Sequence, residues 1–178
     1  MANPRFIDNG DGTFTLPALG LMFTKATVTP ECVTHTQAEA ACAELRTAGH
    51  DDWRLPTRAE LLTLVDDTLH QPAINVDAFP DTKSDWYWTS TVSAWSSARA
   101  WCVHFDNGDC GLGYRDLSFG LVRAVRSVPA GYALVPRGMF EAEMRRREVG
   151  ADWDQASPMI KKGWYEVAND AIDAMGEP

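Results

Sequence analysis

The sequence predicts an α+β domain of two helices and short antiparallel strands, followed by a small helical appendage. Two observations support this prediction. First, strand patterns, two capped helices and further strand patterns follow one another as far as Val128, an order typical of α+β domains. Second, Pro129-Ala130-Gly131 is a turn-forming stretch that separates a domain, residues 1–128, from an appendage, residues 129–178.

The first expected element is a hairpin within residues 5–23. Its turn, Asp8-Asn9-Gly10-Asp11-Gly12, is acidic enough to suggest calcium binding. Glycines, however, occupy positions where an EF-hand loop needs oxygen ligands. Because Asn and Gly adopt positive φ at little cost, a tight turn is favoured over a calcium loop.

The two helices are indicated by the same device, a capping box of Thr with Glu three residues later. Thr36 with Glu39 predicts the start of the first helix, which would end near Gly49. Thr57 with Glu60 predicts the start of the second. The buried faces predicted from helical periodicity are Ala38, Ala41, Cys42 and Leu45 in the first helix, and Leu61, Leu64, Val65 and Leu69 in the second.

Short strands dominate residues 86–128. The segment 86–91 is rich in aromatic and β-branched residues, and its alternation places Trp86 and Trp88 on one face and Tyr87 on the other. The remaining elements expected are a loop at 93–98, a strand at 101–105, an Asn107-Gly108 turn, a loop at 111–116 and a closing strand at 121–126.

The four cysteines are expected to be reduced. A two-residue Asn-Gly turn would place Cys110 opposite Phe105, with Cys102 on the other face of the hairpin, so the two thiols could not bond. The sequence has no C-x-x-C or H-x-x-x-H spacing, so we expect no metal site and no cofactor.

Composition excludes some classes of partner. A net charge of −9 and a pI near 4.8 argue against nucleic-acid binding, which depends on clustered Lys and Arg. No apolar run approaches the roughly 20 residues of a membrane span. The start, MANPRFIDNGDG, lacks the layout of a signal peptide, so bacterial cytoplasm is the expected location unless the chain is part of a virion.

WRLPTRAEL, YWTST, AWCVHFDNGD and VRAVR follow one another in the sequence. Together with neighbouring strings, they resemble the Lcl C-terminal domain family, which is named after Legionella collagen-like adhesins. The resemblance covers about residues 5–128 and implies a C-type lectin-like fold, with relatives among formylglycine-generating enzymes and phage receptor-binding proteins. These four strings are its most specific parts.

The sequence departs from these relatives at three points. The disulfide that often joins the first helix to the last strand cannot form, because Ala124 stands where the family often has a partner for Cys42. The Glu-Pro-Asn, Gln-Pro-Asp and Trp-Asn-Asp tripeptides of calcium-dependent lectins are missing, so calcium-mediated sugar binding is not supported. The copper-binding cysteine pair of formylglycine-generating enzymes has counterparts only in Cys102 and Cys110, which the expected register separates.

The appendage carries a resemblance of its own. GYALVPRGMFEAEM is similar to a module at the end of many phage and prophage proteins, which suggests a phage origin. A final amphipathic helix would present an apolar stripe for docking onto a neighbouring subunit or another virion protein. The predicted docking residues are Trp164, Val167, Ile172 and Met175.

The seven tryptophans raise the question of ligand contact. Trp53 and Trp101 belong to family strings and are expected in the core. Trp95 lies among small residues, where it could be a plug folded onto the core or an exposed binding platform. The loop 113–119 is either an ordinary loop with an Arg–Asp pair or a ligand-binding patch, whose predicted contacts are Tyr114, Arg115, Asp116 and Phe119.

No catalytic residues are predicted. The capping box accounts for Glu60, and His104 has no visible nucleophile partner. The leading hypothesis is therefore a non-enzymatic binding module that recognises a cell-surface glycan or protein. The alternatives are a structural virion protein, with homo-oligomers as one form of assembly, and an oxidase related to the formylglycine-generating enzymes.

Overall fold

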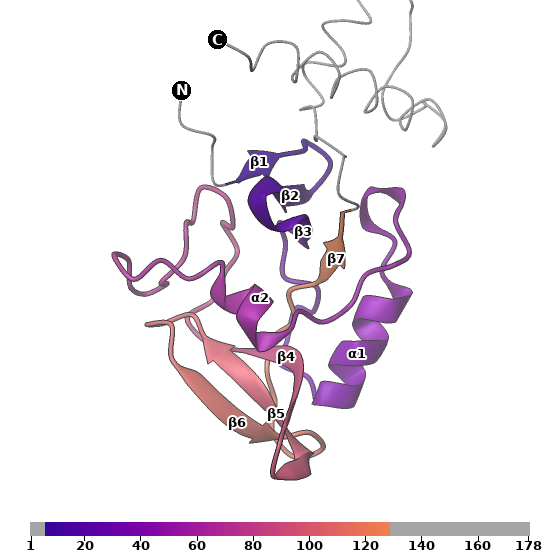
Figure 1. Ribbon diagram of the computed structural model, residues 1–178, viewed down its shortest axis with the longest axis vertical. Coiled ribbons are helices and arrows are strands. Elements are labelled where there is room, and N and C mark those ends of the chain that lie inside the picture. The colour runs from indigo at the N-terminus through magenta and orange to yellow at the C-terminus, as the bar shows by residue number, and fades with distance from the viewer. Residues whose placement is uncertain (1–5, 129–178) are drawn as a thin grey trace, which may run out of the picture.

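The computed structural model describes residues 6–128, which form two small antiparallel sheets at opposite ends of the domain (Figure 1). The predicted α+β class is confirmed, while the finer comparison with C-type lectins stays a prediction. The predicted helical appendage, with Trp164, Val167, Ile172 and Met175, lies outside the described residues.

The first sheet has the strand order β1-β2-β3-β7 and contains the predicted hairpin. Its strands are β1 (Ile7–Asp8), β2 (Thr13–Leu16), β3 (Leu21–Thr24) and β7 (Val125–Ser127). In the turn after β1, Gly10 and Gly12 have φ angles of 73° and 87°. Asp11 accepts hydrogen bonds from the backbone and hydroxyl of Thr13, so it serves the turn itself, as expected for a tight turn.

Helix α1 (His35–Glu44) begins two residues earlier than predicted. Thr34 is the N-cap, and its hydroxyl accepts a hydrogen bond from the Gln37 backbone while the Gln37 side chain accepts one from Thr34. Both Thr34 and Thr36 have a capping partner three residues later. The backbone pairing of Val33 with Gly120 ends just before Thr34, so the tertiary structure selects the earlier cap. Glu39 is thereby left free for another contact.

Helix α2 (Arg58–Leu62) begins as predicted, with Thr57 and Glu60 forming the capping box. Glu60 also accepts two hydrogen bonds from the Arg54 guanidinium, at 2.8 and 2.7 Å. The helix is much shorter than its apolar pattern suggests. Leu61 and Leu64 are buried, but Leu69 lies beyond the helix and is exposed, so the prediction that Leu69 is buried was wrong.

The second sheet has the order β4-β5-β6, formed by β4 (Trp86–Ser93), β5 (Ser96–His104) and β6 (Cys110–Tyr114). Two predicted loops are wrong here. Most of 93–98 belongs to strands, and only Ala94 and Trp95 form the turn. Residues 111–114 are strand as well. The reason is packing: a Cβ on Gly111 or Gly113 would lie 2.7 Å from the ring of Trp86 or Trp88, respectively.

All four cysteines are free, as predicted, but the hairpin register differs from the expected one. Cys110 pairs with Val103 rather than with Phe105, and Cys102 pairs with Gly111. The turn between β5 and β6 is therefore longer than two residues. Because Cys102 and Val103 are neighbours on one strand, Cys102 and Cys110 still point to opposite faces.

Strand β4 divides the core in two, with the alternation predicted from sequence. Tyr87 packs in one hydrophobic cluster with Val103 and Leu121, and Trp88 packs in the other with Cys42 and Ala124. Trp53 is buried and donates its indole N–H to the Thr47 carbonyl. Trp101, which was also predicted in the core, is only partly buried.

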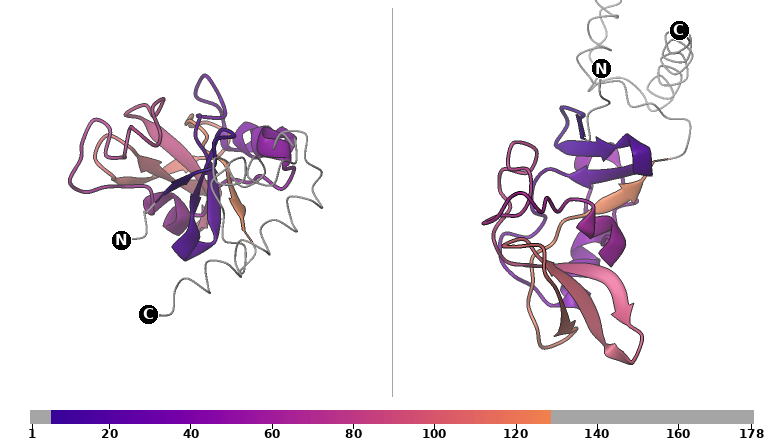
Figure 2. Two further views of the ribbon diagram at one scale, coloured as in Figure 1. Left: turned by 90° about the horizontal axis from the view of Figure 1, so that it is seen from above. Right: turned by 60° about the vertical axis from the view of Figure 1, so that its left-hand side comes forward.

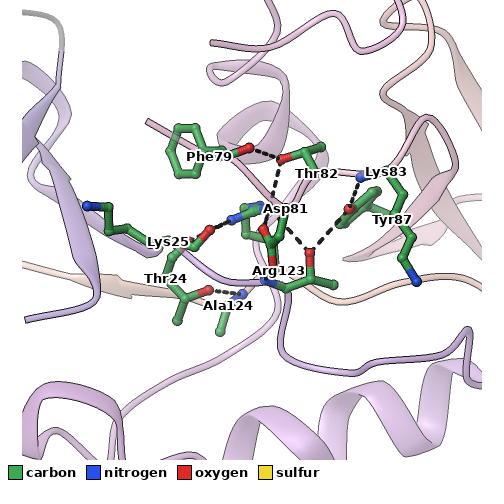
Figure 3. Close-up of polar contacts among 10 residues, drawn as sticks. Thr24, Lys25, Phe79, Asp81, Thr82, Lys83, Tyr87, Arg123 and Ala124 are labelled. Atoms are coloured by element: carbon green, nitrogen blue, oxygen red, sulfur yellow. Dashed lines mark hydrogen bonds and ion pairs between the residues drawn. The ribbon is translucent and has the colours of Figure 1, made fainter. Parts of the chain in front are cut away.

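The predicted closing strand at 121–126 is a strand only from Val125 onward. Before that, the chain crosses between the sheets and buries Arg123 completely (Figure 3). Its guanidinium donates to the carbonyls of Thr24 and Lys25 at 2.8 and 2.5 Å, to the Thr82 hydroxyl at 2.9 Å, and pairs with Asp81 at 3.3 Å. Arg123 thus joins three segments that are far apart in the sequence.

Candidate functional site

The predicted ligand-contact loops meet at one end of the domain, which we call the distal end. It consists of the β4–β5 turn and the loop 115–119 after β6 (Figures 1 and 2). The two are joined directly, because the Arg115 backbone N–H donates to the Ala98 carbonyl at 2.9 Å. The first sheet, where the described chain begins and finishes, lies at the opposite end.

The distal end exposes large hydrophobic side chains. Trp95 is 74% exposed at the β4–β5 turn, so the plug interpretation is wrong and the side chain stands open to a ligand. Leu117 is 75% exposed and Phe119 61%. Tyr114 and Val92 are exposed as well, so most of the exposed large hydrophobic side chains in the described residues lie at this end.

The Trp95 ring is supported by Trp101. It packs edge-on against Trp101, with ring centroids 6.5 Å apart. The Arg58 guanidinium lies 4.3 Å from the centroid of the Trp101 ring. Arg58 comes from the first turn of α2, where its backbone N–H donates to the Thr91 hydroxyl. Helix α2 therefore contributes to a face otherwise formed by β5.

A second arginine–aromatic stack lies beside the first. Arg99 pairs across the strands with Tyr114, and its guanidinium lies 4.2 Å from the Tyr114 ring centroid while also hydrogen-bonding the phenol oxygen. Trp101 pairs with Leu112 in the same register. Strand alternation places Arg99 and Trp101 on one face, with the two arginine–aromatic stacks side by side.

Arg115 fixes the distal loop to helix α1. The expected Arg–Asp pair is not the one that Arg115 makes: it pairs with Glu39, at 3.2 Å. Its Nε donates to Nδ1 of His35 at 3.1 Å, and Nε2 of His35 meets the Thr89 carbonyl at 2.9 Å. Since a carbonyl only accepts, the proton of neutral His35 sits on Nε2, and Nδ1 is free to accept from Arg115.

The loop 115–119 is closed at both ends by backbone contacts. The Ser118 backbone N–H donates to the Tyr114 carbonyl at 2.9 Å, and the Ser118 hydroxyl accepts from the Tyr114 N–H. Gly120 and Val33 exchange hydrogen bonds of 2.9 and 3.0 Å. These contacts fix the backbone of the loop on both sides of Leu117 and Phe119.

The predicted contacts Trp95, Tyr114, Arg115, Asp116 and Phe119 all lie on the β4–β5 turn, at the end of β6 or in the loop that follows it, which meet at the distal end. Sequence reasoning missed Arg58, Arg99, Trp101 and Leu117. Arg99 and Trp101 could have been found from strand alternation with Tyr114 as a guide. Arg58 carries no local signal, because only the packing of α2 on β5 brings it to this face.

His104 and the two buried cysteines, Cys42 and Cys102, have structural surroundings. His104 accepts the Asp106 backbone N–H at Nδ1 and packs edge-on against Trp86. Burial raises the pKa of both Cys42 and Cys102 to about 12, so these thiols stay protonated at neutral pH. Within residues 6–128, no group of three or more potential metal ligands occurs, and no helix is long and apolar enough to cross a bilayer.

Residues 12–126 match the Lcl C-terminal domain family, so the match spans more than half of the chain. The chain has no match among the curated proteins.

Proposed function

The chain belongs to the Lcl C-terminal domain family, and from this premise we propose that it is a non-enzymatic, adhesin-like binding module. The segments 93–98, around the β4–β5 turn, and 113–119, from the end of β6 into the following loop, contact a carbohydrate or a protein on a cell or virion surface. The single observation that carries this proposal is the exposure of Trp95, Tyr114, Leu117 and Phe119 on loops that meet at one end.

The arrangement suits binding for two reasons. Exposed large hydrophobic side chains cost solubility, and when they cluster they mark interaction sites. Aromatic and arginine side chains are also the residues that carry most binding energy in protein interfaces. The distal end lies at the opposite end of the domain from β1 and β7, where the described residues begin and end.

The test is binding to whole bacterial cells and to a glycan array by the full chain. The variant Trp95→Ala/Tyr114→Ala/Phe119→Ala removes three exposed aromatic side chains from the distal end. We expect it to lose at least about tenfold in apparent affinity, since truncating an interface anchor costs about 2 kcal/mol or more.

The matched control is Leu19→Ala/Leu69→Ala/Val76→Ala, which removes three exposed hydrophobic side chains elsewhere. We expect this control to bind as wild type does. If both variants bind as well as wild type, the distal end is not the binding site and the proposal fails.

A further inference from the structure

Two arginines of the distal end have no carboxylate partner. Lys25, Arg54, Arg115, Arg123 and Arg126 each pair with an acid. Arg58 and Arg99 do not: among residues 6–128, no carboxylate lies within ion-pair distance of either guanidinium. This is notable in a chain of 25 acidic and 16 basic residues, in which carboxylates are abundant.

Both guanidinium groups are instead stacked on aromatic rings, Arg58 on Trp101 and Arg99 on Tyr114. Stacking holds the planar group still and leaves N–H donors at its edge, the geometry that carboxylates bind in a bidentate manner. It also occupies one face of each ring. Those faces are therefore closed to the stacking by which a sugar ring would bind.

We propose that this face, formed by Arg58, Arg99, Trp101 and Tyr114, binds an extended acidic segment of a partner protein. The inference rests on the proposed function and names the class of ligand. The charge of such a segment complements the site locally, because Arg58 and Arg99 are two cations with no carboxylate partner among residues 6–128.

The spacing of the two stacks favours a polypeptide. Arg99 and Trp101 are two residues apart on β5, so their side chains project roughly 6.6 Å apart on one face. Alternate side chains of an extended peptide have the same spacing. A strand-like segment with acidic residues at alternate positions therefore matches the repeat of the strand that carries Arg99 and the Trp101 ring on which Arg58 is stacked.

A hydrophobic neighbour also favours a protein. Trp95 is 74% exposed and packs against Trp101, so it lies next to the Arg58 stack and can bury an apolar side chain of a peptide. Apolar contacts of this kind exclude water and strengthen the neighbouring carboxylate–arginine pairs.

The test is titration of the full chain with a short poly-L-glutamate peptide at low ionic strength, measured by calorimetry and tryptophan fluorescence. A Gly-Ser peptide of the same length is the neutral control, and polygalacturonate of matched charge tests a carbohydrate source of carboxylates. We expect binding of poly-L-glutamate alone, weakened by added salt.

The variant Arg58→Gln/Arg99→Gln should weaken this binding at least tenfold. Its control, Arg46→Gln/Lys83→Gln, changes the net charge equally but removes cations whose side chains bond backbone carbonyls elsewhere. We expect the control to bind as wild type does, and circular dichroism to show both variants folded.

Three outcomes would overturn the inference: no binding of poly-L-glutamate, equal weakening in both variants, or tighter binding of polygalacturonate. The proposed function would survive any of them if the Trp95→Ala/Tyr114→Ala/Phe119→Ala variant still loses cell binding. If that variant binds cells normally, the proposed function itself fails.

Discussion

The two ends of the domain differ in how some of their arginines are matched. Around the first sheet, three arginines are matched to acids: Arg126 to Asp52 at 2.6 Å, Arg54 to Glu60 at 2.7 Å and the buried Arg123 to Asp81 at 3.3 Å. Near the distal end, Arg115 is matched in the same way, to Glu39. At the distal end, Arg58 and Arg99 are matched to aromatic rings and keep their charge unpaired. Paired cations stabilise a fold, whereas unpaired ones remain available to a ligand.

The same contrast holds for hydrophobic side chains. Phe14 and Phe23 pair across β2 and β3 and are buried in the larger core cluster. At the distal end, Leu117 and Phe119 are exposed on a loop that hydrogen bonds hold in place. This contrast predicts that changes around the first sheet lower the stability of the domain more than changes at the proposed binding surface of the distal end, and each of the following changes tests that division.

The largest effect is expected from Arg123→Ala. It leaves the carbonyls of Thr24 and Lys25 and the Thr82 hydroxyl without the guanidinium, and each buried polar group left without its partner costs about 1–3 kcal/mol. Urea denaturation should show this loss in the free energy of unfolding. Arg99→Ala is the matched change at the distal end and should cost less than about 1 kcal/mol. Equal losses in the free energy of unfolding of the two variants would contradict the proposed division between the two ends.

An intermediate effect is expected from Gly113→Ala. The added Cβ would lie 2.7 Å from the buried Trp88 ring and 3.1 Å from the Ser118 side chain, so either the ring or the strand must move. Overpacking of this kind costs about 1–3 kcal/mol. Thermal unfolding followed by circular dichroism measures the cost. Gly49→Ala is the control for added bulk, because nothing lies within 4 Å of its Cβ, although its positive φ adds some strain.

The smallest effect is expected from Glu60→Gln, which tests how the Arg54–Glu60 pair makes the free energy of unfolding depend on pH. The Arg54 hydrogen bonds hold the pKa of Glu60 below its ordinary value of 4.5. A carboxyl group whose pKa is lower in the folded state than in the unfolded state stabilises the fold. This stabilisation is fully present at a pH above the unfolded-state pKa and is lost as the pH falls through the folded-state pKa. Glu60→Gln should therefore be less stable than wild type by about 1 kcal/mol at pH 7, a modest value for a partly exposed pair.

Urea midpoints of wild type and Glu60→Gln, measured from pH 7 down to pH 3, check this prediction. The difference between the two proteins should shrink as the pH falls below about 4.5. A difference that stays constant across this range would show that Glu60 acts through its capping of α2 rather than through its charge.

Local signals predicted much of the fold. The Thr57–Glu60 cap and the alternation of Trp86, Tyr87 and Trp88 depend on neighbours in sequence, and both are confirmed. The predictions that were wrong concern elements that depend on contacts between residues far apart in the sequence. Strand β6 resembled a loop because of Gly111 and Gly113, and those glycines are explained only by the tryptophans of β4 that pack against them.

In the candidate site, too, the residues that could not be predicted depend on contacts far apart in the sequence. Exposure of Trp95 was left open by its sequence, since a tryptophan among small residues fits a plug and a platform equally well. Its fate depends on the two-residue β4–β5 turn, which lifts it away from the core. Arg58 could not be assigned to the site at all, because α2 reaches β5 only in the folded chain.

The buried Arg123 acts as a cross-link that needs no oxidant. It ties the chain after β3, the segment around Asp81 and the approach to β7 by hydrogen bonds and one ion pair, while all four thiols stay unpaired. A cross-link of this kind forms as soon as the chain folds and is indifferent to the surrounding redox potential. Its integrity should therefore be the same before and after treatment with a reducing agent.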